Sequence, residues 1–238
     1  MKKGIIGVIV CLILLSFSPG FAGEKPRMGV LRFTNDTSAG WWGATAGRDL
    51  QDMLIAELAG KKVFNVLERK ELDAVLGEQD LGASGRLNKK TTCKIGNITG
   101  AKYLVAGTVS AFEHDTSGEG AGVSFQGISI GGKRDRAYMA VDLKVIEVET
   151  GEIYDVRTVE ATSKSGGLRL GVSRGSFGGS LGKYKNTPVG KAIRACIMEI
   201  ADYLECSIIK GKDAPCIGEY AAKESARREK TKGSIDLE

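Results

Sequence analysis

The segment from Gly118 to Lys185 constrains the fold of this chain more than any other part of the sequence. It is dense in glycine and serine, and yet short apolar runs persist between charged, turn-like breaks. Within those runs apolar residues recur at every second position: Val123 and Phe125; Ile128 and Ile130; Ala137, Met139, Val141 and Leu143; Leu168, Leu170 and Val172. A period of two is the pattern of a β-strand, whose successive side chains point to opposite faces of a sheet. The segment therefore predicts β-structure.

Two kinds of sheet are compatible with this alternation. A soluble strand with alternating faces buries one of them on a core. Segments of about 10 alternating residues separated by turns are also the weak pattern of outer-membrane strands. The two interpretations lead to different functions, and the alternation by itself leaves both open.

The N-terminus has the pattern of a secretory signal. Met1-Lys2-Lys3 is basic, residues 4–17 are apolar and uncharged, and a short region of small residues ends at Ala22. We expect cleavage after Ala22, so that residues 1–22 are a signal peptide. The apolar run is shorter than the about 20 residues that a spanning helix needs. Cys11 follows Val10 rather than Gly, Ala or Ser, so no lipid anchor is expected.

Composition and charge argue against a nucleic-acid partner. The formal net charge is +5, which falls to about +3 when the two lysines of the signal leave. No basic stripe with interleaved aromatic residues is present in the sequence. The chain has 33 Gly against 4 Pro without a collagen period, a balance that marks turns and closely approached backbone.

The sequence also argues against an enzyme. Its single histidine, His114, lies where a strand end enters a turn, which is an ordinary place for an exposed imidazole. The glycine-spaced run at 118–122 lacks the helix and the lysine that a phosphate-binding loop uses. We expect no catalytic residue, no cofactor and no metal site.

Four cysteines remain after cleavage, an even number that permits disulfides in an exported protein. Cys206 and Cys216 flank a turn-rich stretch and are a possible disulfide pair, although spacing alone cannot prove pairing. Cys93 and Cys196 fall on apolar positions of predicted helices, where we interpret them as small buried hydrophobic residues.

Alternating strands and helices in the first half predict an α/β layer. The strands are expected at Arg27–Phe33, Val63–Leu67 and Tyr103–Val109, the last buried on both faces, and the helices around Leu50–Leu58, Leu72–Leu76 and Thr91–Ile98. A long amphipathic helix follows, with Thr187 as N-cap, Pro188 in the first turn and apolar residues at 189, 193, 196, 197, 200 and 204. The charged tail at 221–238 predicts a frayed helix or disorder.

Three blocks, in order and in spacing, are similar to one family. They are Phe64–Leu72 (FNVLERKEL) continued by VLGEQ at 75–79, then GAKYLVAG at 100–107, and VDLKVIEVETGEI at 141–153. Together they cover roughly Lys25 to Cys206. On these blocks the chain resembles the curli secretion channel (CsgG) family, whose members form ring-shaped outer-membrane channels.

The resemblance implies an α+β fold: a periplasmic α/β domain within residues 23–220 and two Gly-rich β-hairpins that join a shared β-barrel. The first hairpin would occupy about 118–143 with its tip near 131–135, and the second about 158–184. One chain then offers at most four spanning strands, which leave unpaired edges in lipid, so a homo-oligomeric ring is required. The second hairpin fits less well, because Arg169 and Arg174 lie on opposite faces and one of them would meet lipid at about 2–4 kcal/mol.

The resemblance also suggests site residues. The family's pore narrows at a loop between the first strand and the first helix, lined by aromatic and amide side chains. Here that loop carries Trp41 and Trp42 without the amide, so both are predicted at the pore constriction; core packing or a hydrophobic staple is the alternative. The matched blocks contain residues expected to be structural: Glu68, Arg69, Gly107, Thr150, Gly151 and Glu152. For Glu68 and Arg69, subunit or domain contacts and an ordinary surface ion pair are both open.

Two functional hypotheses follow. The first is a non-enzymatic, oligomeric outer-membrane channel for secretion of unfolded polypeptide, in which the partners are other copies of the chain, the secreted polypeptide or accessory assembly proteins, and the outer membrane. The second is a soluble periplasmic CsgG-like binding or regulatory module without a working barrel. The expected localisation is exported, in the periplasm or outer membrane. The Gly-rich hairpins favour the first hypothesis, and the missing lipid anchor favours the second.

Overall fold

The computed structural model describes residues 24–115, 123–125, 128–130, 136–164, 181 and 186–233. Three predictions therefore lie outside the described residues: the signal peptide with its cleavage site and absent lipid anchor, the proposed hairpin tip at 131–135, and most of the second hairpin. Within the described parts no helix is both long and apolar enough to cross a membrane.

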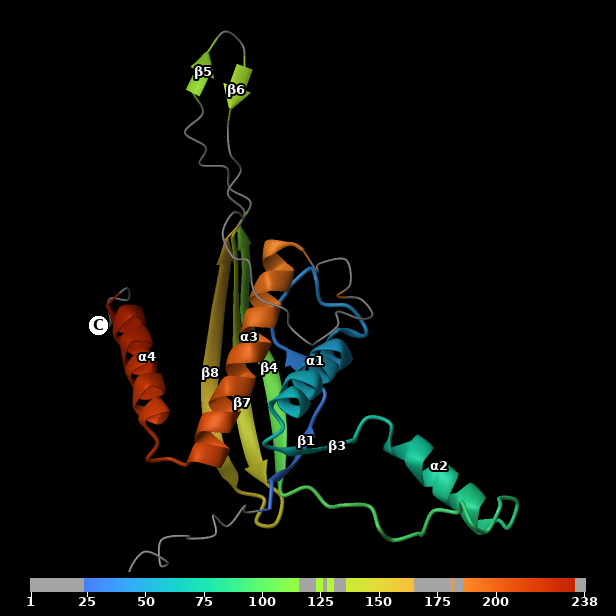
Figure 1. The fold of residues 1–238 in the computed structure, drawn as a ribbon. Coiled ribbons are helices and arrows are strands. Elements are labelled where there is room, and N and C mark those ends of the chain that lie inside the picture. The colour runs from blue at the N-terminus through green and yellow to red at the C-terminus, as the bar shows by residue number, and fades with distance from the viewer. Residues whose placement is uncertain are drawn as a thin grey trace, which may run out of the picture.

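A six-stranded mixed sheet forms the centre of the molecule (Figure 1). Its strand order is β3-β1-β4-β7-β8, and β2 pairs with β4 off this path. β1 runs parallel to β3 and β4, whereas β4, β7 and β8 are antiparallel neighbours. The strands are β1 Arg27–Val30, β2 Thr34–Asn35, β3 Asn65–Leu67, β4 Tyr103–Asp115, β7 Arg136–Glu147 and β8 Ile153–Lys164. This arrangement confirms the α+β class.

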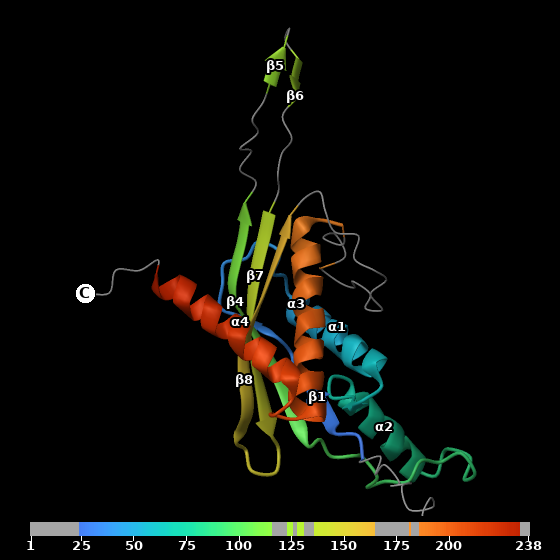
Figure 2. The ribbon, with the colours of Figure 1, turned by 60° about the vertical axis from the view of Figure 1, so that its left-hand side comes forward.

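Two helices, α1 (Ala46–Lys61) and α3 (Pro188–Leu204), lie side by side and cover one face of the sheet (Figures 1 and 2). We call the sheet with α1 and α3 the body. A short π-helix, η3 (Glu205–Lys210), extends α3, and α4 (Pro215–Lys232) follows it. The helix α2 (Leu72–Ala83) projects away from the body. The core therefore lies between the sheet and the pair α1 and α3.

The helix α3 forms as the sequence predicts. Thr187 has an extended backbone, its hydroxyl oxygen accepts a hydrogen bond from the Gly190 N–H at 3.2 Å, and Pro188 occupies the first turn. The predicted apolar stripe faces the core and is buried: Val189, Ile193, Cys196, Ile197, Ile200 and Leu204. Because this face packs against the core, its apolar residues recur with the 3.6-residue period of a helix, which made the helix predictable from the sequence.

Gly107 lets a large core side chain lie against the backbone of β4. A Cβ atom at this position would lie 2.3 Å from Cε1 of Phe33, closer than two carbon atoms can approach. Phe33 is itself among the largest fully buried side chains. The structural role expected for Gly107 is therefore close packing, which only glycine allows.

Two of the predicted elements differ from the structure. Residues 91–98 form no helix: Thr91 and Thr92 instead donate hydrogen bonds to the carbonyl of Asn88, and Gly96 has a positive φ of 83°. Cys93 is consequently exposed rather than buried. In β4 only alternate residues such as Val105 and Val109 are fully buried, because α1 and α3 cover a single face of the sheet. The prediction of burial on both faces is wrong.

Two described strand pairs lie in or next to the region predicted as the first hairpin. The strands β4 and β7 stay paired as far as Asp115 opposite Arg136. Beyond them β5 (Val123–Phe125) pairs with β6 (Ile128–Ile130), with Phe125 opposite Ile128. The predicted tip at 131–135 lies outside the described residues. Figure 1 shows β5 and β6 projecting beyond one end of the body.

The charged tail is helical through most of its length. The sequence left a frayed helix and disorder open, and the structure has the continuous helix α4 over Pro215–Lys232. The expected domain boundary after residue 220 therefore falls inside a helix. Tyr220 is its single fully buried residue within the described part of the chain.

Candidate functional site in the tryptophan loop and the arm

The loop at 36–45, which we call the tryptophan loop, joins β2 to α1 at the end of the body from which β5 and β6 project (Figure 1). Its first turn is held by Asn35, whose side-chain oxygen accepts hydrogen bonds from the Thr37 backbone N–H at 3.2 Å and hydroxyl at 2.7 Å. The Asp36 N–H donates to the Val109 carbonyl at 3.0 Å. The loop is therefore fastened to β4.

The structure places the two tryptophans differently. Trp41 is 3% exposed, and its ring meets those of Trp42 and Phe112 edge-on at centroid distances of 5.4 and 5.7 Å. Its indole Nε1 finds no hydrogen-bond acceptor among the described residues. Trp42 stays half-buried at the margin of this cluster. In the single chain, Trp41 thus packs in the core, and Trp42 is the member of the pair that reaches the surface.

The segment at 68–102, which we call the arm, leaves the body after β3, carries α2 and returns to β4 (Figure 1). Glu68 shapes its beginning: one side-chain oxygen accepts hydrogen bonds from the backbone N–H groups of Lys70 at 2.5 Å and Glu71 at 3.1 Å. Burial pushes the pKa of Glu68 upward, but these N–H groups outweigh it and hold the pKa below its usual range.

Arg69 joins the outgoing and returning parts of the arm. Its guanidinium donates to the Thr99 carbonyl at 2.8 Å and to the Glu68 carbonyl at 2.8 Å. The surface ion pair that the sequence left open for Glu68 and Arg69 is therefore absent among the described contacts. Lys70 pairs with Asp52 of α1 at 2.7 Å, which anchors the base of the arm to the body.

Thr150, Gly151 and Glu152 build the turn between β7 and β8. Gly151 has a φ of 72°, a conformation that favours glycine, and its N–H donates to the Glu147 carbonyl at 2.9 Å. The Glu147 N–H in turn donates to the Glu152 carbonyl at 2.9 Å. The Thr150 hydroxyl accepts from the Glu152 N–H at 3.2 Å. Hydrogen bonds of Thr150, Gly151 and Glu152 thus close the turn between β7 and β8.

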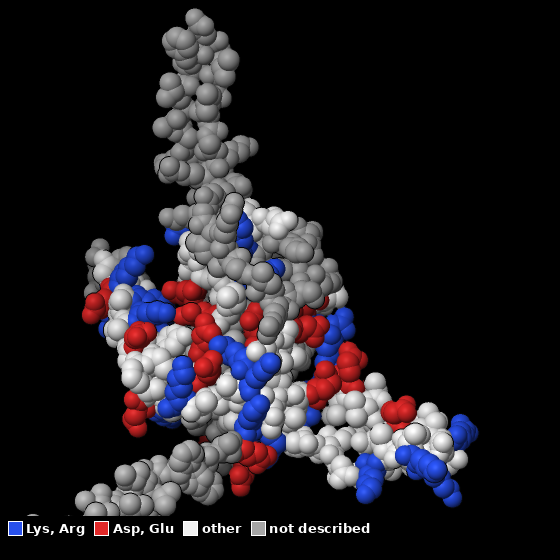
Figure 3. Space-filling view, in the orientation of Figure 1, with Lys and Arg blue, Asp and Glu red and all other residues white. Residues whose placement is uncertain are grey.

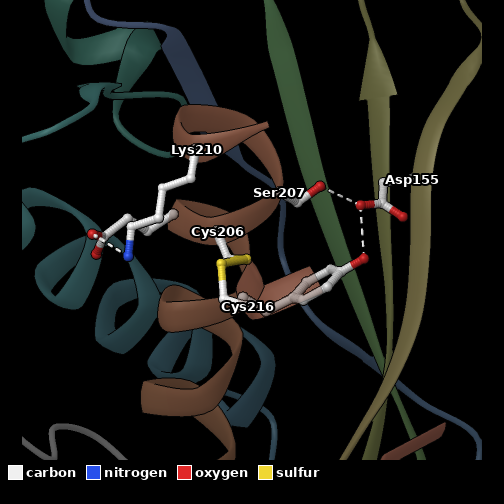
Figure 4. Close-up of a disulfide and its surroundings, with 7 residues drawn as sticks. Asp155, Cys206, Ser207, Lys210 and Cys216 are labelled. Atoms are coloured by element: carbon white, nitrogen blue, oxygen red, sulfur yellow. Dashed lines mark hydrogen bonds and ion pairs between the residues drawn. A yellow bond between two sulfur atoms is a disulfide. The ribbon is translucent and has the colours of Figure 1, made fainter. Parts of the chain in front are cut away.

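Cys206 and Cys216 form a disulfide, as their spacing suggested, with the Cα atoms 6.2 Å apart (Figure 4). The bridge ties η3 to the first turn of α4. Cys196 lies on the buried face of α3, and burial raises the pKa of its thiol to about 12. This confirms the interpretation of Cys196 as a small core residue.

A polar cluster beside the disulfide was not predicted from the sequence. The Asp155 carboxylate of β8 accepts hydrogen bonds from the Tyr203 hydroxyl at 2.7 Å and from the Ser207 hydroxyl (Figure 4). Arg157 lies over the rings of Tyr203 and Tyr220, which contact each other edge-on, and donates to the Tyr220 carbonyl at 2.7 Å. These contacts dock α4 beside β8. They join strand and helix residues far apart in sequence, so no local pattern could reveal them.

Comparison with known families agrees with this fold. The sequence matches the family model described as "Curli production assembly/transport component CsgG" over residues 16–235. The chain belongs to the CsgG family. Among the described residues of this CsgG-family chain, no group of three or more His, Cys, Asp or Glu side chains could hold a metal ion.

Individual CsgG proteins are distant relatives. "Curli production assembly/transport component CsgG" of Salmonella typhimurium is 26% identical over 154 residues, as is the protein of that name from Escherichia coli K12. Each match covers 61% of this chain and 56% of the relative, so the matched part spans little more than half of those proteins.

Two solved structures that are similar to this chain share less sequence identity with it. The hypothetical protein CT253 from Chlamydia trachomatis has a TM-score of 0.44 and 14% identity, and the match covers 76% of this chain and 96% of that one. A PelC dodecamer from Paraburkholderia phytofirmans has a TM-score of 0.34 and 15% identity, with coverage of 75% and 87%.

Proposed function

We propose that this protein is an exported subunit of an oligomeric outer-membrane channel that secretes unfolded polypeptide, as in curli-type export. Membership of the CsgG family, which is described as an assembly and transport component, supports a secretion role. The observation that carries the proposal is the long antiparallel pair β4 and β7, which leads away from the body toward β5 and β6 (Figure 1).

The length of the segment between β4 and β7 fits a membrane-spanning hairpin. Asp115 lies opposite Arg136, so the 20 residues at 116–135 provide about 10 residues for each of its two strands. A tilted spanning strand needs about 9–11 residues. A single hairpin would expose unpaired backbone groups to lipid at several kcal/mol each, which a closed ring of copies avoids. In this proposal the second hairpin, at about 158–184, completes the contribution of each chain.

The tryptophan loop supplies the constriction in this proposal. It lies at the end of the body from which β5 and β6 project, where a polypeptide would enter the barrel. Trp42, which is half-buried, faces the pore in each copy, and Trp41 supports it from the core. Trp42→Ala is expected to raise single-channel conductance with little change in melting temperature. Trp41→Ala is expected to cost about 3–5 kcal/mol of folding stability instead.

One observation favours the second hypothesis, a periplasmic binding or regulatory module without a working barrel. Trp41 is 3% exposed in the single chain, and a sheet with α1 and α3 on one face already has a closed core without other copies. Such a module would remain monomeric and conduct no ions.

Planar-bilayer recording of two proteins tests the proposal. The first is the wild type, and the second replaces residues 116–135 by Asn-Gly, a two-residue turn that can join the paired Asp115 and Arg136. We expect stepwise conductance from the wild type and none from the shortened protein, with similar melting temperatures. A wild type that never conducts, or a shortened protein that conducts equally, would contradict the channel.

A further inference from the structure

The arm exposes an unusual amount of apolar surface for a segment outside the body. Of α2, only Gly82 is buried. The exposed large apolar side chains of the arm are Val75 at 40%, Leu76 at 42%, Leu81 at 37%, Ile95 at 61% and Ile98 at 38%. Figure 1 shows α2 standing clear of the sheet and of α1 and α3. Apolar side chains gathered on a projecting element mark a surface that another molecule covers.

The outer half of the arm is also strongly basic. The sequence from Leu81 to Phe112 contains no Asp or Glu, whereas Arg86, Lys89, Lys90 and Lys94 are exposed on the arm. None of these four side chains makes an ion pair with a described residue. Figure 3 shows Lys and Arg gathered at the far end of the arm. A partner of the arm should therefore present carboxylates together with apolar side chains.

The turn between β7 and β8 has this complementary chemistry. We call residues 147–153 the acidic turn; they carry Glu147, Glu149 and Glu152. Val148 and Ile153, beside these carboxylates, are 45% and 57% exposed. None of the three glutamates forms an ion pair within the described part of the chain. Figure 3 shows Asp and Glu at the lower end of the body, where Figure 1 places this turn.

The two surfaces are arranged to meet between copies of the chain. The arm follows β3 at one edge of the sheet, whereas the acidic turn joins β7 to β8 at the other edge. Both lie toward the end of the body opposite β5 and β6 (Figure 1). The returning end of the arm contacts its own acidic turn, because the Val148 N–H donates to the Lys102 carbonyl at 2.9 Å. The projecting part of the arm, which carries α2, points away from that turn (Figure 1), and Arg69 and Lys70 hold its base. A contact between different surfaces of identical chains is heterologous and closes into a ring when the rotation allows.

We propose that the arm of one copy docks, through its basic segment 86–98, on the acidic turn of the next copy. This inference rests on the proposed function, because it names the contact that joins the subunits of the ring. Lys89, Lys90 and Lys94 face Glu149 and Glu152 of the neighbour, and Ile95 and Ile98 cover Val148 and Ile153. Because both surfaces lie at the same end of the body, every hairpin in such a ring points in one direction.

Charge exchange tests the contact. Three proteins are compared with the wild type by native mass measurement in detergent: an arm variant (Lys89→Glu with Lys90→Glu), a turn variant (Glu149→Lys with Glu152→Lys), and one carrying all four changes. Each pair of changes places like charges opposite each other and should raise the concentration for half-assembly about tenfold or more. The four changes together should restore assembly. An equimolar mixture of the arm and turn variants should assemble better than either variant alone, because each contact between unlike copies joins opposite charges.

A matched control changes charge without touching the contact. Lys230→Glu with Lys232→Glu, on the exposed end of α4, alters net charge as much as the arm variant does and should assemble like the wild type. Melting temperatures of all variants verify that the body stays folded. In addition, salt screens the charges at the contact, so raising the salt concentration should weaken assembly of the wild type and of the control variant to the same extent.

Four outcomes would overturn the contact. Rings of the arm or turn variant that form as readily as those of the wild type would show that the charges do not meet, while the channel itself would stand. Failure of the four changes to restore assembly would have the same meaning. Normal assembly of the arm variant, with loss of binding to vesicles containing anionic phosphatidylglycerol, would assign the arm to a membrane surface. A wild type that stays monomeric would overturn both the contact and the proposed function.

Discussion

The helices α3 and α2 have similar apolar content in sequence, but they occupy opposite environments. One side of α3 is almost completely buried between the sheet and α1, whereas α2 buries a single glycine. The apolar side of α3 packs against the core of the body, whereas the apolar side chains of the arm have no such core beside them in the described part of the chain. An apolar pattern therefore predicts that a surface will be covered, but not by which molecule. In the body the cover is internal, and in the arm we propose that it is a second copy.

The largest expected effect on stability comes from placing a carboxylate in the buried face of α3, and the same change on the exposed α2 provides the comparison. Ile197→Asp places an unpaired carboxylate in the core, where Ile197 is 1% exposed, and should cost about 3–5 kcal/mol or prevent folding. Leu76→Asp on α2, where the side chain is 42% exposed, should change the melting temperature little. Circular dichroism on both proteins makes the comparison, and equal losses would show that α2 belongs to the core of the body.

The helix α4 is intermediate between the buried α3 and the exposed α2, and removal of its disulfide tests what holds it to the body. Like α2, it is mostly exposed, but Tyr220 and the bridge from Cys216 to Cys206 hold it. Replacing both cysteines by serine should lower stability by about 2–3 kcal/mol, since the bridge closes a loop of 10 residues. Amide hydrogen exchange should accelerate in α4 before it does so in α3. Uniform acceleration across both helices would mean that α4 unfolds only with the body.

Two glycines provide a closer comparison. Gly107→Ala brings a Cβ atom against Phe33 in the body and should cost about 1–3 kcal/mol. Gly77→Ala lies on α2 with open space around it, and should stabilise that helix by up to about 1 kcal/mol. Denaturant unfolding of the two variants gives both values. A harmless Gly107→Ala would mean that Phe33 can move away from β4.

The smallest expected effect concerns pH at the base of the arm. The backbone N–H groups bound to Glu68 favour its carboxylate, so the pKa of Glu68 is lower in the folded chain than in the unfolded chain. The stabilisation is complete above the unfolded pKa of about 4.3 and is lost as the pH falls through the lower folded pKa. The protection factors of the Lys70 and Glu71 amides, which correct for the slower intrinsic exchange in acid, should therefore fall as the pH is lowered. In Glu68→Gln this acid-dependent fall should be absent, and its persistence would assign it to another group.

Local patterns predicted the parts of the fold that depend on neighbouring residues. The sequence indicated the capped start of α3 and its buried face, and it offered Cys206 and Cys216 as a possible disulfide pair. The full length of β4 was not, because the register shifts between Val109 and Ala111 and the alternation changes phase there. Residues 91–98 were predicted as a helix because their apolar spacing resembles one. Without a core beside them, glycine and threonine hydrogen bonding decide their conformation instead.

The candidate site was predictable in kind but not in detail. Family resemblance directed attention to Trp41 and Trp42 together, but their separation into a core ring and a half-buried ring depends on Phe112, which lies on a distant part of the chain. Likewise, the blocks containing Glu68 and Thr150 were recognised, but not that one starts the arm and the other closes the acidic turn. Such roles arise from contacts between elements, which single-sequence patterns do not encode.

Native mass measurement of the wild-type protein, extracted from bacterial membranes with detergent, tests the central claim most directly. If the chain is a channel subunit, the protein should fractionate with the outer membrane and its mass should be one discrete, large multiple of the mature chain. A single mature chain, recovered from the soluble periplasmic fraction without detergent, would contradict the channel and leave the periplasmic module.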